Sequence, residues 1–431
     1  MAVLAILVAA SFLAAATAAS PVPAIYVLGD SLADVGNNNH LPTILRADFP
    51  HNGIDYPGKK ATGRFSNGKN SVDFLADNLG LASPPPYLAL SSSSANYVNG
   101  VNFASGGAGV SNDTNKGQCI VFDKQIDYFS SVSASLAQSL GQAQASAHLS
   151  KSLFAITIGS NDIIHYARSA SSAAGDSLSP QPFVDALIQT LTAQLQRLYD
   201  LGARKLVFLG TGPVGCCPSL RELSATKNCS AVANDASVRY NNAAASLLSG
   251  MAARHSDMRY ALFDSSAALL QFINQPAKYG FAEAKAACCG LGDMNAKIGC
   301  TPLSFYCSNR TSHIFWDFYH PTETTARMLT STAFDGLSER AGPKPILDVA
   351  DVEQSADKSS PFPPPSSSTA TPGARHGAFA SVGAKSQRSS CFSQVHQVFS
   401  GPKLALAELV FSGRDQRPGV KWGSRMESNN M

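Results

Sequence analysis

This sequence has no excess of charge of one sign. Among its 431 residues, 33 Lys and Arg stand against 30 Asp and Glu, which gives a net charge of +3 at pH 7. Residues 1–340 carry 23 basic and 23 acidic side chains, so the whole excess falls within residues 341–431. Because nucleic-acid binding depends on a concentrated positive field, we expect no nucleic-acid partner.

The motifs typical of metal and phosphate-cofactor sites are also missing. The sequence has neither a C-x-x-C pair nor H-E-x-x-H, and such spacings are typical of zinc sites. One glycine-rich segment, Ser105–Gly109, resembles a phosphate-binding turn, but its glycines do not follow G-x-G-x-x-G. We therefore expect no metal and no cofactor, and zinc bound by cysteines is the rival interpretation.

Basic residues are absent from the first twenty positions, which form an apolar run rich in alanine and end before Pro21 and Pro23. Ala16-Thr17-Ala18 fits the small-residue pattern of signal-peptidase sites, so we expect residues 1–20 to be a signal peptide. The alternative is a membrane anchor, which needs roughly 20 apolar residues and better flanks. We expect no integral membrane anchor and an extracellular protein.

The glycosylation sequons and the cysteines also indicate an extracellular protein. Candidate glycosylation sites begin at Asn112, Asn228 and Asn309, and such sites accept glycans only in a secretory context. An even number of cysteines within residues 24–340 predicts disulfides in an oxidising compartment. We expect these cysteines to be largely oxidised, with at most Cys391 left as a free thiol. The eight are Cys119, Cys216, Cys217, Cys229, Cys288, Cys289, Cys300 and Cys307.

Apolar runs alternate with helical patterns up to about residue 340. Strands are predicted near residues 25–28, 98–104, 153–158, 205–209 and 259–263. Helices are predicted over residues 70–80, 121–149 with a break at Gly141, 180–201, 231–255 and 322–337. Continuous apolar strands that alternate with helices indicate a parallel sheet covered on both faces, so we expect one α/β domain over residues 24–340. Residues 341–431 are rich in Pro, Ser and Gly, and we expect a mostly disordered tail.

Three of the predicted strands end in polar or glycine-rich turns. Ser31 follows the first strand, Gly106 and Gly107 follow the second, and Asn161 follows the third. Because the carboxyl ends of parallel strands meet at one edge, where ligands bind, we expect these residues to lie close together. Taken singly they have plainer interpretations, since Ser, Asp and Asn are also the favoured helix caps.

Asp317 and His320 complete a possible set for acyl transfer. A serine nucleophile needs a base to accept its proton, a group that orients the base, and donors for the oxyanion. His320 suits the base, and Asp317, three residues earlier, suits the orienting group. The backbone N–H groups of Ser31 and Gly106 and the side-chain amide of Asn161 suit the oxyanion. A histidine in an aromatic run is, however, often simply a packed residue.

Four blocks occur in order along residues 22–340: Gly29-Asp30-Ser31-Leu32, residues 102–109, Gly159-Ser160-Asn161-Asp162, and residues 317–323. Together they resemble the GDSL esterase/lipase family of the SGNH hydrolase superfamily, in its plant secreted branch. The resemblance implies a flavodoxin-like three-layer fold with a central, mainly parallel sheet. It implies a serine esterase or lipase that hydrolyses small-molecule or lipid carboxylic esters outside the cell, in the apoplast or cell wall.

The resemblance also assigns roles to residues. It implies Ser31 as nucleophile, Asp317 and His320 as the rest of the triad, and Gly106 and Asn161 as oxyanion donors with Ser31. Gly107 is the alternative to Gly106, because the glycine pair leaves the register open by one. An acyltransferase would use the same residues and is the second hypothesis. The third is a non-catalytic, defence-associated binding protein, since some relatives in this branch have lost the serine.

Overall fold

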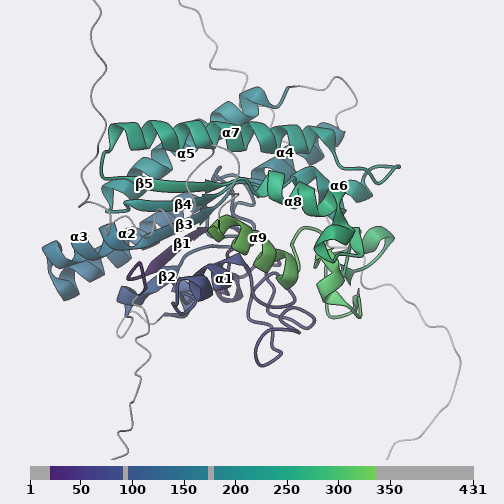
Figure 1. Cartoon of the computed structure of the whole chain (residues 1–431), viewed down its shortest axis with the longest axis horizontal. Coiled ribbons are helices and arrows are strands. Elements are labelled where there is room, and N and C mark those ends of the chain that lie inside the picture. Colours follow the sequence, from purple (N-terminus) through teal and green to yellow (C-terminus); the bar gives the residue numbers. More distant parts are fainter. Residues whose placement is uncertain (1–19, 91–95, 173–178, 336–431) are drawn as a thin grey trace, which may run out of the picture. The chain divides into compact units, whose positions relative to one another are not determined.

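In a computed structural model of the chain, residues 20–90, 96–172 and 179–335 are described (Figure 1). The expected signal peptide, apart from its last residue, and the expected tail lie outside these residues. Within the described ranges, no helix is both long enough and apolar enough to cross a membrane.

A five-stranded sheet forms the centre of the fold, and its strands are parallel in the order β2-β1-β3-β4-β5. This order is that of flavodoxin-like folds, so the predicted fold class is confirmed. The strands are β1 (Ile25–Gly29), β2 (Gly100–Asn102), β3 (Leu153–Thr157), β4 (Lys205–Leu209) and β5 (Arg259–Phe263). The second strand is shorter than expected at both ends: residues 97–99 form a 3-10 turn before it, and it ends at Asn102.

Helices pack on both faces of the sheet, which gives three layers (Figure 1). One face is covered by α2 (Phe122–Leu140), α4 (Ser160–Ser172), α5 (Gln181–Asp200) and α7 (Ala231–Arg254). The other face is covered by α1 (Ser71–Asn78), α8 (Ser265–Asn274) and α9 (Glu323–Asp335). Two further helices are α3 (Gln142–Lys151), which begins after the predicted break at Gly141, and the short α6 (Pro218–Glu222).

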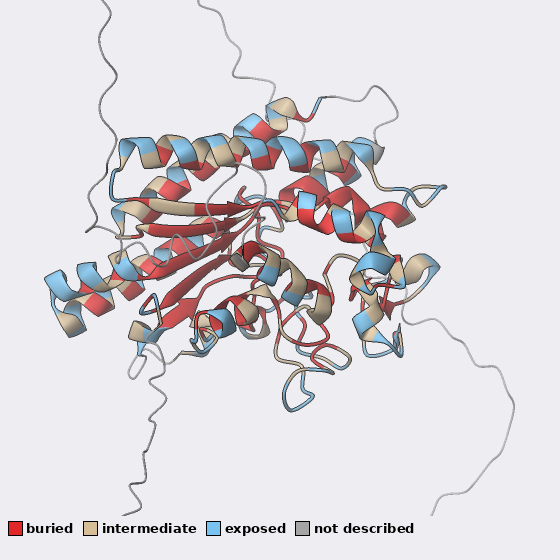
Figure 2. Ribbon diagram, viewed as in Figure 1, coloured by how far each residue is buried: buried red, intermediate tan, exposed pale blue. Residues whose placement is uncertain are grey.

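Successive side chains of each strand point to opposite helical layers. In β1, Tyr26 and Leu28 pack with the α2 layer, whereas Ile25 and Val27 pack with the α1 layer. All five residues of β1 are buried, as the red strands of Figure 2 show. This burial on both sides explains why the strands are continuous apolar runs rather than alternating ones.

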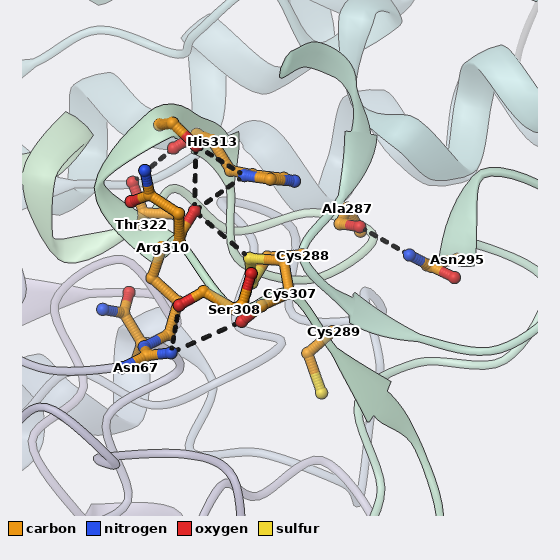
Figure 3. Close-up of a disulfide and its surroundings, with 12 residues drawn as sticks. Asn67, Ala287, Cys288, Cys289, Asn295, Cys307, Ser308, Arg310, His313 and Thr322 are labelled. Atoms are coloured by element: carbon orange, nitrogen blue, oxygen red, sulfur yellow. Dashed lines mark hydrogen bonds between the residues drawn. A yellow bond between two sulfur atoms is a disulfide. The ribbon is translucent and has the colours of Figure 1, made fainter. Parts of the chain in front are cut away.

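Disulfides hold a small lobe beside the sheet. Its strands are β6 (Glu283–Ala287), β7 (Cys289–Gly290), β8 (Phe305–Tyr306) and β9 (His313–Phe315), with β6 parallel to β9 and β7 antiparallel to β8. Cys288 bonds to Cys307 (Figure 3), and Cys289 bonds to Cys300. Both bridges attach the loop over residues 290–312 to the chain beside β9, the strand that leads to His320.

The cysteine prediction is only partly right. A third disulfide joins Cys216 to Cys229, but Cys119 and Cys217 are free thiols. Burial raises the pKa of the Cys119 thiol to about 11 and that of Cys217 to about 12. An even number of cysteines therefore did not mean complete pairing, and both free thiols are poor nucleophiles at neutral pH.

Thiol counting tests this assignment. Denatured but unreduced protein should be alkylated at Cys119 and Cys217 and at none of the six bridged cysteines, as mapped by peptide mass spectrometry. Native protein at neutral pH should be alkylated at these two positions much more slowly, because their thiolates are scarce. Alkylation of any bridged cysteine in unreduced protein, or a bridge that contains Cys119 or Cys217, would contradict the pairing.

Candidate active site

Ser31, His320 and Asp317 form one chain of hydrogen bonds. His320 Nε2 lies 2.7 Å from Ser31 Oγ, and His320 Nδ1 lies 2.8 Å from both carboxylate oxygens of Asp317. With Nδ1 protonated and donating to Asp317, Nε2 is an acceptor for the serine hydroxyl. Asp317 and His320 are buried, whereas Ser31 is half-buried. This arrangement activates a serine as a nucleophile on several unrelated folds.

Ser31 lies two residues beyond the end of β1, and the strand end is held from two sides. Gly29 has φ of 150°, and a Cβ there would lie 2.2 Å from the Thr157 carbonyl oxygen, so only glycine fits. The buried Gln125 of α2 accepts from the Gly29 N–H and donates to its carbonyl, both at 2.8 Å. Gln125 therefore supports the site, although no local sequence pattern singles it out.

The turn that carries His320 is fixed by its own backbone. Asp317 Oδ1 accepts from the backbone N–H groups of Tyr319 and His320 at 2.9 and 2.8 Å. The Trp316 N–H donates to the His320 carbonyl at 2.8 Å, and the buried Trp316 indole donates to Asn52 Oδ1 at 2.9 Å. Two backbone N–H groups of this turn therefore hold the Asp317 carboxylate, which in turn contacts His320 Nδ1 and fixes the imidazole ring.

Of the two glycines that follow β2, the structure favours Gly107 rather than Gly106 as an oxyanion donor. The Gly106 N–H already donates to Asp34 Oδ2 at 3.0 Å. Gly107 lines the cavity at Ser31, and its N–H has no hydrogen-bond partner among the described residues. Ser31 also lines this cavity, and its N–H likewise has no hydrogen-bond partner among the described residues. Among the described residues, the N–H of Gly106 is thus occupied, whereas that of Gly107, the neighbour that the glycine pair left open, is not.

Asn161 lies where expected, in the first turn of α4. Its Nδ2 donates to the Ala108 carbonyl at 2.9 Å, and this bond uses one of the two amide hydrogens. The residue lines the same cavity as Ser31 and is half-buried. The N-terminus of a helix carries partial positive charge, so α4 also favours an anion at this position.

A polar network that was not predicted joins the loops after β1 and β2. The buried Asp34 accepts from the N–H groups of Gly36 and Asn37 at 2.7 and 2.8 Å, in addition to Gly106. Asn37 Nδ2 donates to the carbonyls of residues 102 and 104, and Asn38 Nδ2 donates to that of Gly106 at 2.8 Å. The asparagine-rich segment 37–39 is therefore a scaffold for the glycine turn, although its sequence is also typical of an ordinary surface turn.

A buried ion pair positions an aromatic ring beside the histidine. Arg64 binds both carboxylate oxygens of Asp73 in α1 at 2.7 Å, with the side chains 7% and 2% exposed. Arg64 holds the pKa of Asp73 below its ordinary value despite the opposing effect of burial. The next residue, Phe65, packs against the His320 ring with centroids 4.9 Å apart.

A cavity of about 930 Å³ lies at Ser31. Ser31, Gly107, Asn161, Asp317 and His320 all line it. The turns after β1, β2 and β3 therefore meet at this cavity, because the carboxyl ends of parallel strands lie at one edge of the sheet. The turn at residues 317–320 reaches the same cavity.

Asp30, directly before Ser31, is a buried carboxyl with an incomplete set of partners. Its Oδ1 accepts from the Leu32 N–H at 3.0 Å, whereas Oδ2 has no hydrogen-bond partner among the described residues. Burial raises the pKa of Asp30 to about 7, although the Leu32 N–H and the nearby His320 oppose the shift. The Leu32 contact belongs to a turn, since no helix begins directly after Asp30.

Comparison with known proteins gives one family. The model of GDSL-like lipases/acylhydrolases matches residues 25–331. An Arabidopsis thaliana GDSL esterase/lipase is 42% identical over 320 residues, which covers 72% of this chain and 84% of the relative. A second from the same plant is 38% identical over 325 residues, covering 74% of this chain and 90% of the relative. The solved structure of an extracellular lipase from Streptomyces rimosus aligns with 72% of this chain and 99% of its own at 17% identity, with a TM-score of only 0.28.

The raised pKa of Asp30 predicts that the stability of the folded protein depends on pH. Because its pKa of about 7 in the folded protein exceeds the ordinary 3.8, the unfolded chain loses this proton first as the pH rises. The Asp30 contribution to the free energy of unfolding should therefore fall between about pH 4 and pH 7 and stay constant above. The Asp30→Asn variant keeps an acceptor for Leu32 but cannot titrate.

Urea unfolding of both proteins, without reductant, at several pH values measures this contribution. The stability of Asp30→Asn relative to the parent should rise by about 1 kcal/mol per pH unit across that window. A stability difference that does not change with pH would contradict the raised pKa.

Proposed function

This chain belongs to the GDSL-like lipase/acylhydrolase family, and we propose that it hydrolyses carboxylic esters through an acyl-enzyme on Ser31. The observation that carries the proposal is the hydrogen-bond chain from Ser31 through His320 to Asp317, with distances of 2.7 and 2.8 Å. Family membership rests on the matched residues 25–331 and on relatives of 38–42% identity.

In the first step, Ser31 Oγ attacks the ester carbonyl carbon while His320 Nε2 accepts the hydroxyl proton. Asp317 stabilises the resulting imidazolium and keeps the ring in the productive orientation. The tetrahedral intermediate collapses when the carbon–oxygen bond to the alcohol breaks, and His320 returns the proton to the leaving alkoxide oxygen. A water molecule then attacks the acyl-serine by the same route, which releases the acid and regenerates Ser31.

The oxyanion is bound by the Ser31 and Gly107 N–H groups and by the second amide hydrogen of Asn161. Donors fixed before the reaction stabilise the charge that develops in the transition state without reorganisation. The partial positive charge at the start of α4 adds to this field. Supporting this assignment, both backbone N–H groups lack partners among the described residues and border the cavity.

We further propose that the enzyme is secreted, with residues 1–20 as signal peptide and residues 24–340 as the hydrolase domain. Three disulfides support an oxidising compartment. The candidate glycosylation residues Asn112, Asn228 and Asn309 are all exposed, so each is accessible to a glycan.

Replacement of Ser31 tests the function itself. Ser31→Ala should fold normally but lose nearly all turnover of chromogenic esters, because no covalent route remains. A serine-reactive phosphonate should label Ser31 in the parent protein and nothing in the variant. Ser146→Ala is the matched control, since Ser146 is exposed on α3, and it should keep full activity and labelling. Full turnover by Ser31→Ala would refute the assignment.

Replacement of Asn161 tests the oxyanion assignment. Asn161→Ala should lower kcat by roughly 10²–10³ and change KM less, because the lost bond is made mainly in the transition state. Thermal melting of the variant checks whether loss of the Ala108 contact disturbs the fold. A raised KM with unchanged kcat would instead make Asn161 a residue that binds the ground-state substrate.

A further inference from the structure

Gly106 and Gly107 are the two central residues of a tight turn after β2. The Ala108 N–H donates to the Ser105 carbonyl at 3.1 Å, and Gly107 has φ of 91°, whereas the φ of Gly106 is not positive. A four-residue turn that is closed by this bond and has a left-handed third residue is a type II turn. Its central peptide consists of the Gly106 carbonyl and the Gly107 N–H, the oxyanion donor proposed above.

The central peptide is the part of a β-turn that can reverse. Turns of types I and II differ by about 150–170° in the two dihedral angles that flank this peptide, so its N–H points in opposite directions in the two types. With glycine at both central positions, either type is accessible, because no Cβ opposes it. The sequence of the turn alone therefore does not decide whether the Gly107 N–H faces an oxyanion.

Asn38 holds the central peptide in the observed orientation. Its Nδ2 donates to the Gly106 carbonyl at 2.8 Å and to the Leu45 carbonyl, and its Oδ1 accepts from the Ser105 hydroxyl at 2.5 Å. The residue is fully buried, and both amide hydrogens are used. Because a trans peptide is planar, its carbonyl and its N–H point in opposite directions, so a donor on the Gly106 carbonyl also fixes the direction of the Gly107 N–H. The same bond polarises the peptide and makes this N–H a stronger donor.

A second asparagine holds the peptide on the other side of Gly107. Asn115 Nδ2 donates to the Gly107 carbonyl at 2.8 Å, and Asn115 Oδ1 lies 3.1 Å from Nε2 of His165 in α4. Since Oδ1 is an acceptor only, His165 Nε2 carries a proton and donates it to this bond. Asn115 and His165 both line the cavity at Ser31.

Three of the four backbone polar groups of the glycine pair are therefore held by side chains. Asp34 accepts from the Gly106 N–H, and the two asparagines donate to the two carbonyls. The fourth group, the Gly107 N–H, has no partner among the described residues. Both peptides that meet at Gly107 are thus fixed, and one donor is left for a ligand in the cavity.

We propose that Asn38 and Asn115 are positioning residues for ester cleavage, which hold the turn in the orientation that presents the Gly107 N–H to the oxyanion. The proposal rests on the proposed function, with Ser31 as nucleophile and Gly107 as a donor. Without the Asn38 amide, the observed turn would bury an unpaired carbonyl, a cost that favours the reversed turn by about tenfold or more. The reversed turn aims the Gly106 carbonyl, rather than an N–H, at the oxyanion.

Asn38→Ala and Asn115→Gly test the proposal with p-nitrophenyl butanoate as substrate. Glycine at position 115 removes the amide without backbone strain, because φ is 49° there. We expect kcat to fall about tenfold or more in Asn38→Ala and about fivefold in Asn115→Gly, the net effect of one neutral hydrogen bond. KM should stay within about twofold of the parent value, since the donor acts on charge that develops in the transition state.

Lys116→Ala is the matched control. Lys116 follows Asn115 in the same loop, is exposed, and pairs with the exposed Asp113 at 3.3 Å. It does not line the cavity, so its variant should keep the parent's kcat and KM.

Phenylboronic acid gives a readout that needs no turnover. Ser31 Oγ bonds to boron while His320 accepts the hydroxyl proton, and the resulting tetrahedral anion places a boronate oxygen at the oxyanion position. The dissociation constant of phenylboronic acid should therefore rise in Asn38→Ala and Asn115→Gly by about the factor by which kcat falls.

His165 allows the same test on an exposed side chain, whose replacement leaves the core intact. His165→Ala should lower kcat about twofold to threefold, because Asn115 loses the bond that orients its amide. It should lower kcat no further in Asn115→Gly protein, since His165 acts through Asn115. His165→Gln keeps an N–H donor and should restore most of the loss.

The outcomes separate this proposal from the proposed function. Folded Asn38→Ala and Asn115→Gly proteins with the parent's kcat and boronate affinity, or with a raised KM alone, would overturn the positioning role. If Asn38→Ala shows no cooperative thermal melting, Asn115→Gly and the His165 variants decide by the same criteria. Full turnover by Ser31→Ala would instead overturn the nucleophile.

Discussion

The hydrogen bond between Ser31 and His320 is the contact on which the site depends. Its partners are 289 residues apart in sequence, yet Oγ and Nε2 lie 2.7 Å apart. A base acts on a nucleophile only within hydrogen-bond reach, so a shift of about one ångström in either segment would break the site. Much of the surrounding structure can be understood as support for this one distance.

Support comes from opposite sides of the sheet. On the α2 side, Gln125 clamps the end of β1 with two hydrogen bonds, so the turn that carries Ser31 begins from a fixed point. On the α1 side, the Arg64–Asp73 pair holds Phe65 against the imidazole. Removal of one member of a buried ion pair leaves an unpaired charge, so this pair links the stability of α1 to the geometry of His320. The disulfide lobe adds a third constraint by tying the chain beside β9 to its neighbouring loop (Figure 3).

Much of the fold could be predicted from local patterns, because strands buried on both faces are continuous apolar runs and the helices have clear periodicity. Ser31, Asn161, Asp317 and His320 could be located because each follows a strand or occupies a distinctive turn. Gly106 was not separable from Gly107, since the choice depends on which N–H the buried Asp34 captures. Gln125, Asp34 and the Arg64–Asp73 pair act through contacts between distant segments, and no local pattern marks them. The free state of Cys119 and Cys217 likewise depends on where the fold places each thiol, which counting cysteines cannot supply.

The central claim is that ester cleavage passes through an acyl-serine, and partitioning of that intermediate tests it most directly. Esters that share one acid but differ in their alcohols must give the same acyl-enzyme. With hydroxylamine added at a fixed concentration, the ratio of hydroxamate to free acid should therefore be identical for the p-nitrophenyl, phenyl and ethyl esters of that acid. A ratio that changes with the leaving alcohol would show that water attacks the ester directly, and it would contradict the mechanism built on Ser31.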